Sequence, residues 1–282
     1  MNIFAIIVTF NPEKEDIIKQ HKALYSQVAG FVYVDNNSED SSFLSEISDD
    51  KTYVIRNQNN DGLASAQNKA VMKAKSEGAD FILLFDQDSI PSENMVDKLE
   101  SAYVEASKRG KVATVGPAIY KANTTEKEKM SKGVRLCGFM IKRFDIGELS
   151  EVSYRIASGS LIPINVIEDV GLIEEKLFID GLDMEWCLRA RSKGYKIYET
   201  NRTILNHCLG NGSVNRIKSH SPQREYYINR NSVWMIRQNH IPVGLKVRRL
   251  CFSIGRIMQS LIQCDFKYAQ KGIIGMIDGV KL

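Results

Sequence analysis

The chain has 282 residues, of which 43% are hydrophobic and 26% are charged, and its formal net charge is +4. These values are ordinary for a soluble globular protein, so they exclude a disordered chain and allow one large domain, or a core domain with an appendage. The five cysteines are scattered and include no Cys-x-x-Cys pair, which argues against a zinc cluster and predicts reduced thiols in a cytoplasmic protein.

Three apolar runs in the first part of the chain are expected to be β-strands, and each ends in a polar cluster: residues 3–9, 31–34 and 53–56. Apolar residues recur at helical spacing over residues 17–28 and 63–74. This alternation predicts an α/β fold with a Rossmann-like, mostly parallel central sheet flanked by helices, which binds a nucleotide at the carboxyl ends of its strands. The chain contains neither G-x-G-x-x-G nor G-x-x-x-x-G-K, which counts against a dinucleotide-binding fold and a P-loop.

A fourth apolar run, residues 81–85, breaks abruptly into Asp86-Gln87-Asp88. Because this run has no polar alternation, we expect a strand that is covered on both faces at the centre of a parallel sheet. Two carboxylates one residue apart, at the carboxyl end of such a strand, can bind a hard divalent cation that also holds a diphosphate. The alternative is that Asp86 and Asp88 only solvate the end of the strand.

The elements expected next are a helix, a charged surface loop and several strands: a helix over 92–106, a loop over 121–132, and strands over 112–116, 134–141, 157–163, 196–200 and 203–206. Ser158-Gly159-Ser160 could let a ligand approach the backbone, although packing or a bulge explains such a glycine equally well. His207 follows the last strand, where a single histidine is more often a structural residue than a metal ligand.

Three acidic residues lie within six positions: Asp180, Asp183 and Glu185. Asp183 is placed to begin a helix as its N-cap, with Gly194 as the C-terminal stop. The apolar neighbours of these acids offer a second interpretation, because a carboxylate in apolar surroundings can act as a general base.

The segment QREYYINRNSVWMIRQ is expected to be a helix that displays arginines and tyrosines. Arg224, Tyr227 and Asn231 fall at positions i, i+3 and i+7, with Tyr226 and Arg230 alongside. Guanidinium groups pair with phosphate oxygens through two hydrogen bonds, so this helix is suited to phosphate binding. A solvated helix with ordinary core tyrosines is the alternative.

From residue 243 onwards the chain is expected to form basic amphipathic helices. Residues 244–282 contain seven Lys or Arg against two Asp, a net charge of +5. With its many apolar residues, this segment suits an anionic membrane surface better than a nucleic acid, and we expect Lys246, Arg248, Arg249 and Arg256 at that surface. No window of about 18 residues is free of charge, so contact with the inner face of the cytoplasmic membrane would be peripheral. The same apolar face could instead form a homodimer.

Several motifs, taken together, resemble glycosyltransferase family 2 and, more narrowly, its bacterial rhamnosyltransferase branch. They are VTFNP at 8–12, VDNNS at 34–38, NxxGLAxAxN at 59–68, DQD at 86–88, FIDGLDMEWCLRARSKGY at 178–195, HCLG at 207–210 and REYYINRN at 224–231. The resemblance implies a GT-A fold over residues 1–240, a nucleotide-sugar transferase domain, followed by the basic helical extension 241–282. It also implies inverting transfer from a nucleoside-diphosphate sugar with Mg²⁺ or Mn²⁺.

The resemblance also implies a role for individual residues. Those that match contacts with the nucleoside, or the loop and helix beside the nucleotide, are Thr9, Asn11, Asp35, Gly62 and Asn68. Those that match the metal and sugar-nucleotide motif, with one further position for the metal or diphosphate, are Asp86, Asp88 and His207. Those that match the helix on the diphosphate side are Arg224, Tyr227 and Arg230. Asp183 matches the catalytic base, although many relatives have Glu-Asp where this chain has Leu182-Asp183.

The implied reaction moves L-rhamnose from dTDP-β-L-rhamnose to a hydroxyl of a lipid-linked saccharide in the synthesis of a cell-surface polysaccharide. Two other functions stay open. A nucleotidyltransferase could use the same nucleotide edge, but the chain has no Gly-rich phosphate loop with Arg or Lys near the first strand. A non-catalytic nucleotide-sugar-binding protein would keep Asp35 and Asp86 while having no use for Asp183.

Overall fold

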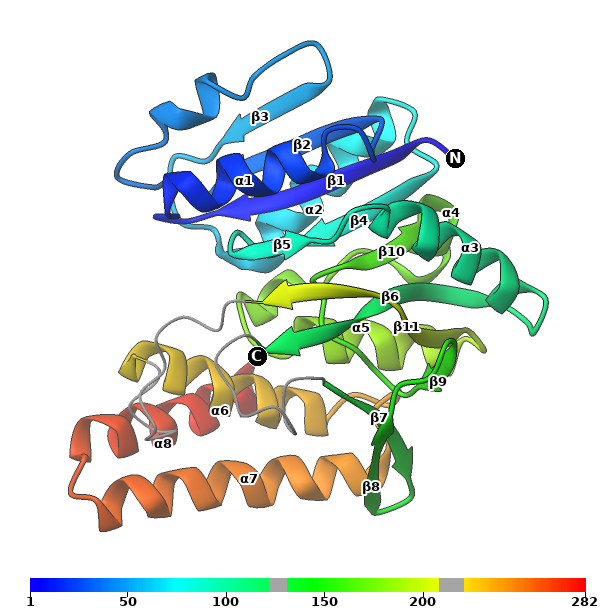
Figure 1. Cartoon of the computed structure of the whole chain (residues 1–282). Helices are drawn as coiled ribbons and strands as arrows, with labels where there is room; N and C mark the ends of the chain where they lie inside the picture. Colours follow the sequence, from blue (N-terminus) through cyan, green and yellow to red (C-terminus); the bar gives the residue numbers. More distant parts are fainter. Residues whose placement is uncertain (122–130, 208–220) are drawn as a thin grey trace.

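A computed structural model describes residues 1–121, 131–207 and 221–282 (Figure 1). Its centre is a nine-stranded sheet in the order β3-β2-β1-β4-β10-β6-β11-β5, with β9 paired to β11. The strands are β1 (Ile3–Thr9), β2 (Gly30–Asp35), β3 (Thr52–Arg56), β4 (Phe81–Phe85), β5 (Ser89–Pro91), β6 (Val112–Lys121), β9 (Ser150–Val152), β10 (Ser160–Pro163) and β11 (Lys196–His207).

The sheet is mixed and mostly parallel, as the sequence predicts. β1 pairs in parallel with β2 and β4, β2 pairs in parallel with β3, and β6 pairs in parallel with β11. The antiparallel pairings are those of β10 with β4 and β6, and those of β5 and β9 with β11. Because β1 lies between β2 and β4, the strand order reverses there, and such a reversal is where open α/β sheets bind ligands.

Helices cover both faces of the sheet, because successive side chains of a strand point to opposite faces. Ile3, Ala5 and Ile7 of β1 pack in one buried cluster with α1 (Lys14–Leu24) and α3 (Met95–Ser107). Phe4 and Ile6 pack in the other with α2 (Gly62–Ser76), α4 (Ile164–Val170) and α5 (Leu182–Ser192). The uninterrupted apolar runs of β1 and β4 are thereby explained, since both faces of these strands are buried.

The central strands come close to the predicted ranges, and the differences lie where the chain turns. The predicted strand 134–141 is a separate hairpin, β7 (Lys132–Cys137) and β8 (Met140–Asp145), with Gly138 at φ +60° in its turn. The predicted pair 196–200 and 203–206 is one strand, β11, whose pairing with β6 shifts register between Thr200 and Ile204. Residues 122–130 of the expected charged loop lie outside the described residues.

The last three helices are α6 (Pro222–Ile236), α7 (Val243–Ile262) and α8 (Phe266–Lys281), which lie together beyond the sheet (Figure 1). α8 packs directly on the backbone of α6, because a Cβ atom on Gly275 would lie 2.3 Å from the carbonyl oxygen of Tyr226. Leu245 of α7 joins Trp234 and Met235 of α6 in a third buried cluster. The predicted boundary between residues 240 and 241 falls in the turn from α6 to α7. Among the described helices, none has the length and apolarity needed to span a bilayer.

Candidate active site

The carboxyl ends of β1 and β2 form a single hydrogen-bonded edge. Thr9 Oγ1 and Ser38 Oγ both donate to Asp35 Oδ1, at 3.0 and 2.6 Å, and the backbone N–H of Ser38 donates to Asp35 Oδ2 at 3.1 Å. Asn11 has a left-handed φ of +45°, and its backbone N–H donates to Ser38 Oγ at 2.8 Å. The structure therefore brings Thr9, Asn11 and Asp35 together beside the point where the strand order reverses.

Asp86 and Asp88 lie in the turn between β4 and β5, and both are half-buried. The backbone of this turn is fixed from two sides, because Gln20 Nε2 donates to the carbonyls of Asp86 and Ser89 at 2.8 and 2.6 Å and the Asp86 N–H donates to Ser158 Oγ at 3.1 Å. Carboxylates on a fixed backbone keep their separation when a cation binds.

His207 ends β11, and its backbone lies in register with Ser89, the residue after Asp88. The backbone of His207 thus lies beside the strand that directly follows Asp88, the other expected metal position. Residues 208–210 of the HCLG motif lie outside the described residues. Within the described ranges, no group of three or more His, Cys, Asp and Glu side chains is arranged to hold a metal ion.

The segment before α5 contains three left-handed residues, Phe178 (φ +62°), Asp180 (φ +67°) and Gly181 (φ +87°). For Phe178 and Asp180 this conformation is unfavourable, because a Cβ atom crowds the backbone there. Asn231 of α6 stabilises the segment, since its Nδ2 donates to the carbonyls of Leu177, Ile179 and Asp180 at 2.8, 2.6 and 2.9 Å.

Arg230 of α6 holds the beginning of the same segment. Its Nη2 donates to the carbonyls of Lys176 and Leu177 at 2.6 and 2.9 Å, and its guanidinium lies 4.8 Å from the ring centre of Tyr227. Residues 175–177 form the short 3-10 helix η3 (Glu175–Leu177). Arg230 therefore donates hydrogen bonds to backbone carbonyls, whereas the sequence predicted that it would contact the diphosphate.

Gly62, Phe178 and Tyr227 form a stack that joins α2, the segment before α5, and α6. The rings of Phe178 and Tyr227 are parallel within 8° and their centres are 4.7 Å apart. A Cβ atom on Gly62 would lie 2.5 Å from the Phe178 ring, and Gly62 itself has a φ of +86°. Glycine is thus required at this position for both conformation and space.

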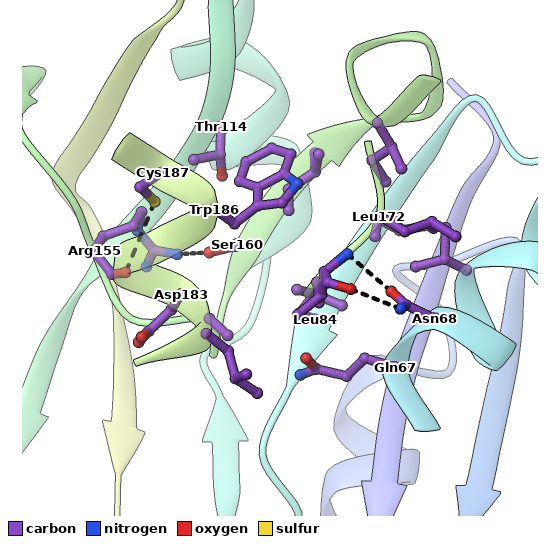
Figure 2. Close-up of a pocket in the computed structure, with 17 residues that line it drawn as sticks. Gln67, Asn68, Leu84, Thr114, Arg155, Ser160, Leu172, Asp183, Trp186 and Cys187 are labelled. Carbon is purple, nitrogen blue, oxygen red and sulfur yellow. Dashed lines mark hydrogen bonds between the residues drawn. The ribbon is translucent and has the colours of Figure 1, made fainter. Parts of the chain in front are cut away.

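Asn68 of α2 ties that helix to the chain before η3. Its Nδ2 donates to the Ile173 carbonyl and to Glu175 Oε1, both at 2.9 Å, and its Oδ1 accepts from the Ile173 N–H at 3.0 Å. Figure 2 shows Asn68 directed at the backbone next to Leu172 through two of these hydrogen bonds. The side-chain amide of Asn68 is therefore engaged by protein atoms.

The three neighbouring acids have different partners. Asp180 is paired with Arg224, whose Nε and Nη2 donate to its carboxylate at 2.8–3.2 Å. Glu185 is paired with Arg189 and His240, each at 2.9 Å. Burial opposes ionisation of Glu185, but the hydrogen bonds with His240 and Arg189 outweigh it and hold its pKa below the usual range.

Within the described residues, the Asp183 carboxylate forms no ion pair with a Lys, Arg or His side chain, and its Oδ1 accepts a hydrogen bond from the backbone N–H of Met184 at 2.8 Å. Burial raises the pKa of Asp183 above its usual value, and the nearby Asp180 adds to this effect, whereas the Met184 N–H and the charge of Arg249 oppose it. A carboxylate with a raised pKa and no cation partner is a stronger base.

The predicted N-cap role of Asp183 is wrong. Helix α5 begins at Leu182, and the cap position is occupied by Gly181 in a left-handed conformation. Gly194, with a φ of +86°, follows the end of α5 as predicted. Asp183 therefore lies inside the first turn, where a carboxylate interacts favourably with the helix dipole.

Asp183 lies between two hollows. One is a small, mostly apolar cavity of about 40 Å³, and Figure 2 shows Asp183 at its edge with the carboxylate directed away from the indole of Trp186. The other is a larger cavity of about 330 Å³ that is also lined by Tyr154, Glu199 and Arg249. The carboxylate therefore borders a space that can admit a ligand.

Arg249 and Tyr154 belong to the surroundings of Asp183 but were not assigned there from the sequence. Arg249 was expected at a membrane surface with Arg256, and for these two residues that prediction is wrong. Arg249 is half-buried beside Asp183, and Arg256 Nε donates to both carboxylate oxygens of the buried Glu225, at 2.9 and 3.1 Å. No motif marks these residues, because a basic amphipathic helix does not reveal which arginines turn inward.

The sequence of the chain is similar to those of known proteins. Residues 4–171 match the family model described as Glycosyl transferase family 2. The chain is 33% identical to the dTDP-rhamnosyl transferase RfbF of Shigella flexneri over 99% of this chain and 96% of that protein.

Two solved structures share the fold at low sequence identity. One is GalNAc-T7 with UDP, GalNAc and Mn²⁺, with a TM-score of 0.62 and 16% identity over 83% of this chain and 51% of that one. The other is TarS of S. aureus, with a TM-score of 0.60 and 16% identity over 91% of this chain and 43% of that one. The chain thus spans about half of the length of either structure.

Proposed function

Because the chain belongs to glycosyltransferase family 2, we propose that it transfers L-rhamnose from dTDP-β-L-rhamnose, with inversion, to a hydroxyl of a lipid-linked saccharide. The family supports a nucleotide-sugar donor, and the near full-length similarity to a dTDP-rhamnosyl transferase supports this particular donor. The product would be an α-L-rhamnoside on a growing cell-surface polysaccharide.

The observation that carries the proposal is the difference among Asp180, Asp183 and Glu185. Asp180 and Glu185 are each paired with an arginine, whereas Asp183 forms no such pair within the described residues and borders a cavity. Only Asp183 therefore has both the free acceptor capacity and the access that a general base needs.

The proposed reaction is a single displacement. Asp183 accepts the proton of the acceptor hydroxyl as that oxygen forms a bond to the anomeric carbon. The bond between this carbon and the diphosphate oxygen breaks on the opposite side, so the diphosphate leaves with the bonding electrons and the β-linked donor gives an α-linked product. Protonated Asp183 then releases its proton to solvent.

A divalent cation would bind at the turn between β4 and β5. Asp86 and Asp88 supply carboxylate oxygens, which Mg²⁺ and Mn²⁺ prefer, on a backbone fixed by Gln20 and Ser158. We assign the metal to Asp88 with His207, and the sugar-nucleotide side to Asp86. When bound, the cation would offset the negative charge on the leaving diphosphate. GalNAc-T7, which shares the fold, was solved with Mn²⁺.

The remaining residues would bind and orient the donor. Thr9, Asn11 and Asp35 would contact the nucleoside at the edge they form together. Arg224 would approach the diphosphate from α6, with its guanidinium oriented by its hydrogen bonds to Asp180. Gly62, Asn68, Tyr227 and Arg230 would shape the wall beside the nucleotide by holding the segment before α5.

The segment 241–282 would hold the enzyme against an anionic bilayer without spanning it. Its two helices expose large apolar side chains, among them Phe252, Ile262 and Phe266, together with the exposed basic residues Arg248 and Lys267. Such a combination favours the interface of anionic membranes. A homodimer through the same apolar side chains would appear instead as a stable dimer that does not bind vesicles.

A thermal-shift screen of nucleotide sugars with Mg²⁺ or Mn²⁺ tests the donor. We expect dTDP-β-L-rhamnose to raise the melting temperature most, since a ligand that binds only the folded state stabilises it. If a different nucleotide sugar stabilises the protein most, that nucleotide sugar is the donor and L-rhamnose is not the sugar transferred. Release of pyrophosphate from a nucleoside triphosphate would point to a nucleotidyltransferase, and tight nucleotide binding without turnover to a binding protein.

A further inference from the structure

A further hollow, of about 700 Å³, lies between the β7–β8 hairpin and α7. We call it the arginine groove, after three arginines that line it: Arg143 of β8, and Arg248 and Arg249 of α7. Its walls are fixed to each other, because a Cβ atom on Gly244 of α7 would lie 2.1 Å from the carbonyl oxygen of Gly138 in the hairpin turn. Figure 1 shows the hairpin beside the beginning of α7.

The charged residues that line the arginine groove are all positive. The residues that line it include three arginines and no Asp or Glu. None of these arginines forms an ion pair with an acid of the described residues. Arg249, which is half-buried, donates to Ser232 Oγ at 3.4 Å and to the Met184 sulfur at 3.1 Å, and the charges of Asp183 and Asp180 act on it without forming an ion pair. Guanidinium groups that are brought together without acids form a site for a multiply charged anion.

The arginine groove is continuous with the candidate base. Tyr154, Met184 and Arg249 line both this groove and the cavity of about 330 Å³ that contains Asp183. A molecule whose anionic group lies on the arginines can therefore extend a sugar hydroxyl to Asp183. The donor residues Asp35 and Asp86 line neither hollow, so the groove belongs to the acceptor side.

Exposed apolar side chains also line the arginine groove. Val247 and Phe252 of α7 line it and remain 47% and 49% exposed. Exposed apolar side chains next to unpaired guanidinium groups are complementary to a molecule that carries a phosphate next to a hydrocarbon chain.

We propose that the arginine groove binds the phosphate of a lipid-phosphate-linked saccharide acceptor, with its lipid along Val247 and Phe252 and its sugar toward Asp183. This inference rests on the proposed function and names the chemistry that selects the acceptor. Arg143 and Arg248 supply the outer charge and Arg249 the inner charge. The lipid part would contact the exposed Val247 and Phe252, which lie on either side of Arg248 and Arg249 in the sequence of α7.

The test uses the full-length protein and vesicles of phosphatidylcholine that contain a minor fraction of polyprenyl phosphate. Arg143→Ala combined with Arg248→Ala removes two exposed arginines, which should leave the fold intact. Lys142→Ala combined with Lys267→Ala is the matched control, because it removes the same charge from exposed residues of the same hairpin and the neighbouring helix α8 that do not line the groove.

We expect the arginine variant to lose about tenfold or more in vesicle affinity, because two charge-assisted contacts to one phosphate are removed. The lysine control should stay close to wild type. Soluble pyrophosphate should compete for the groove, whereas phosphatidylglycerol at the same charge should bind wild type more weakly than polyprenyl phosphate.

Three results would overturn the proposal. Unchanged vesicle binding by the arginine variant would mean that the arginine groove does not bind the lipid phosphate. An equal loss of affinity in the lysine control would mean that general surface charge causes the binding. Retention of pyrophosphate without retention on polyprenyl-phosphate vesicles would mean that the anion is a soluble one. Melting temperatures with nucleotide sugars, measured on the wild type, the double arginine variant and the double lysine control, report on the donor site. If the wild-type protein binds no nucleotide sugar, the proposed function is refuted. Vesicle binding then still tests the arginine groove.

Discussion

Replacing Asp183 by Asn is the substitution that separates catalysis most cleanly from folding. The carboxylate accepts a hydrogen bond from the Met184 N–H at 2.8 Å, and Asn Oδ1 can accept the same bond. The helix cap is untouched, because Gly181 occupies that position. Since burial raises the pKa of Asp183, a neutral amide should fit this environment at least as well. The melting temperature should therefore stay the same or rise.

Turnover should respond very differently. General-base assistance contributes about 10²–10⁴ in rate, which corresponds to about 3–5.5 kcal/mol of activation free energy. The assay is release of dTDP from the donor in the presence of acceptor, with donor affinity measured on the same preparation. We expect donor affinity to change little, because Asp183 lies on the acceptor side of the site.

The pH dependence gives a second readout of the same residue. Protonated Asp183 cannot accept a proton, so kcat/KM should fall as pH falls through its pKa, and burial places that pKa above the usual 3.8. This acid limb should be absent in Asp183→Asn. Turnover within about tenfold of wild type would refute the reasoning. Asp180→Asn and Glu185→Gln serve as controls, and a larger loss in either would move the base to that residue.

Three further substitutions test the metal, the helical packing and a buried acid. Asp88→Ala should abolish donor binding that depends on a divalent cation, and full activity in EDTA would remove the metal assignment. Gly275→Ala should cost about 1–3 kcal/mol of unfolding free energy in chemical denaturation, because its Cβ would lie 2.3 Å from a backbone oxygen of α6. Gly255→Ala, in open space on α7, should instead stabilise by about 0.5–1 kcal/mol, and equal effects would contradict the close packing. Burial raises the pKa of Glu199 to about 7, against the opposing charge of Arg155, so the folded state keeps a proton that the unfolded state releases. Stability should therefore fall by about 3 kcal/mol as pH rises from about 4.5 to about 7, and Glu199→Gln should flatten this slope in thermal melts.

The central part of the fold could be predicted because its strands are continuous apolar runs. β1 and β4 are buried on both faces, so their sequences contain no polar alternation, and the polar residues after them mark the carboxyl edge. The β7–β8 hairpin was missed because Gly138 is the only turn signal between two stretches of similar pattern. One glycine within a strand pattern does not distinguish a turn from a bulge.

The candidate site was only partly predictable, because several of its residues act through distant partners. Asp35 and Thr9 follow neighbouring strands, so their proximity follows from the sheet. Arg230 donates to carbonyls more than fifty positions away, and this pairing depends on how the segment before α5 turns through left-handed residues. Arg249 approaches Asp183 only because α7 packs beside α5 and the hairpin. No local pattern encodes such contacts.

Hydrolysis of dTDP-β-L-rhamnose by the wild-type enzyme with Mg²⁺, followed by proton NMR from the first minutes, tests inverting rhamnosyl transfer most directly and needs no knowledge of the acceptor. Water then takes the place of the acceptor hydroxyl beside Asp183. A single displacement predicts that dTDP and the α anomer of rhamnose appear together, before the anomers equilibrate, and that Asp183→Asn suppresses both. Release of the β anomer first would mean retention of configuration and would contradict the proposed mechanism.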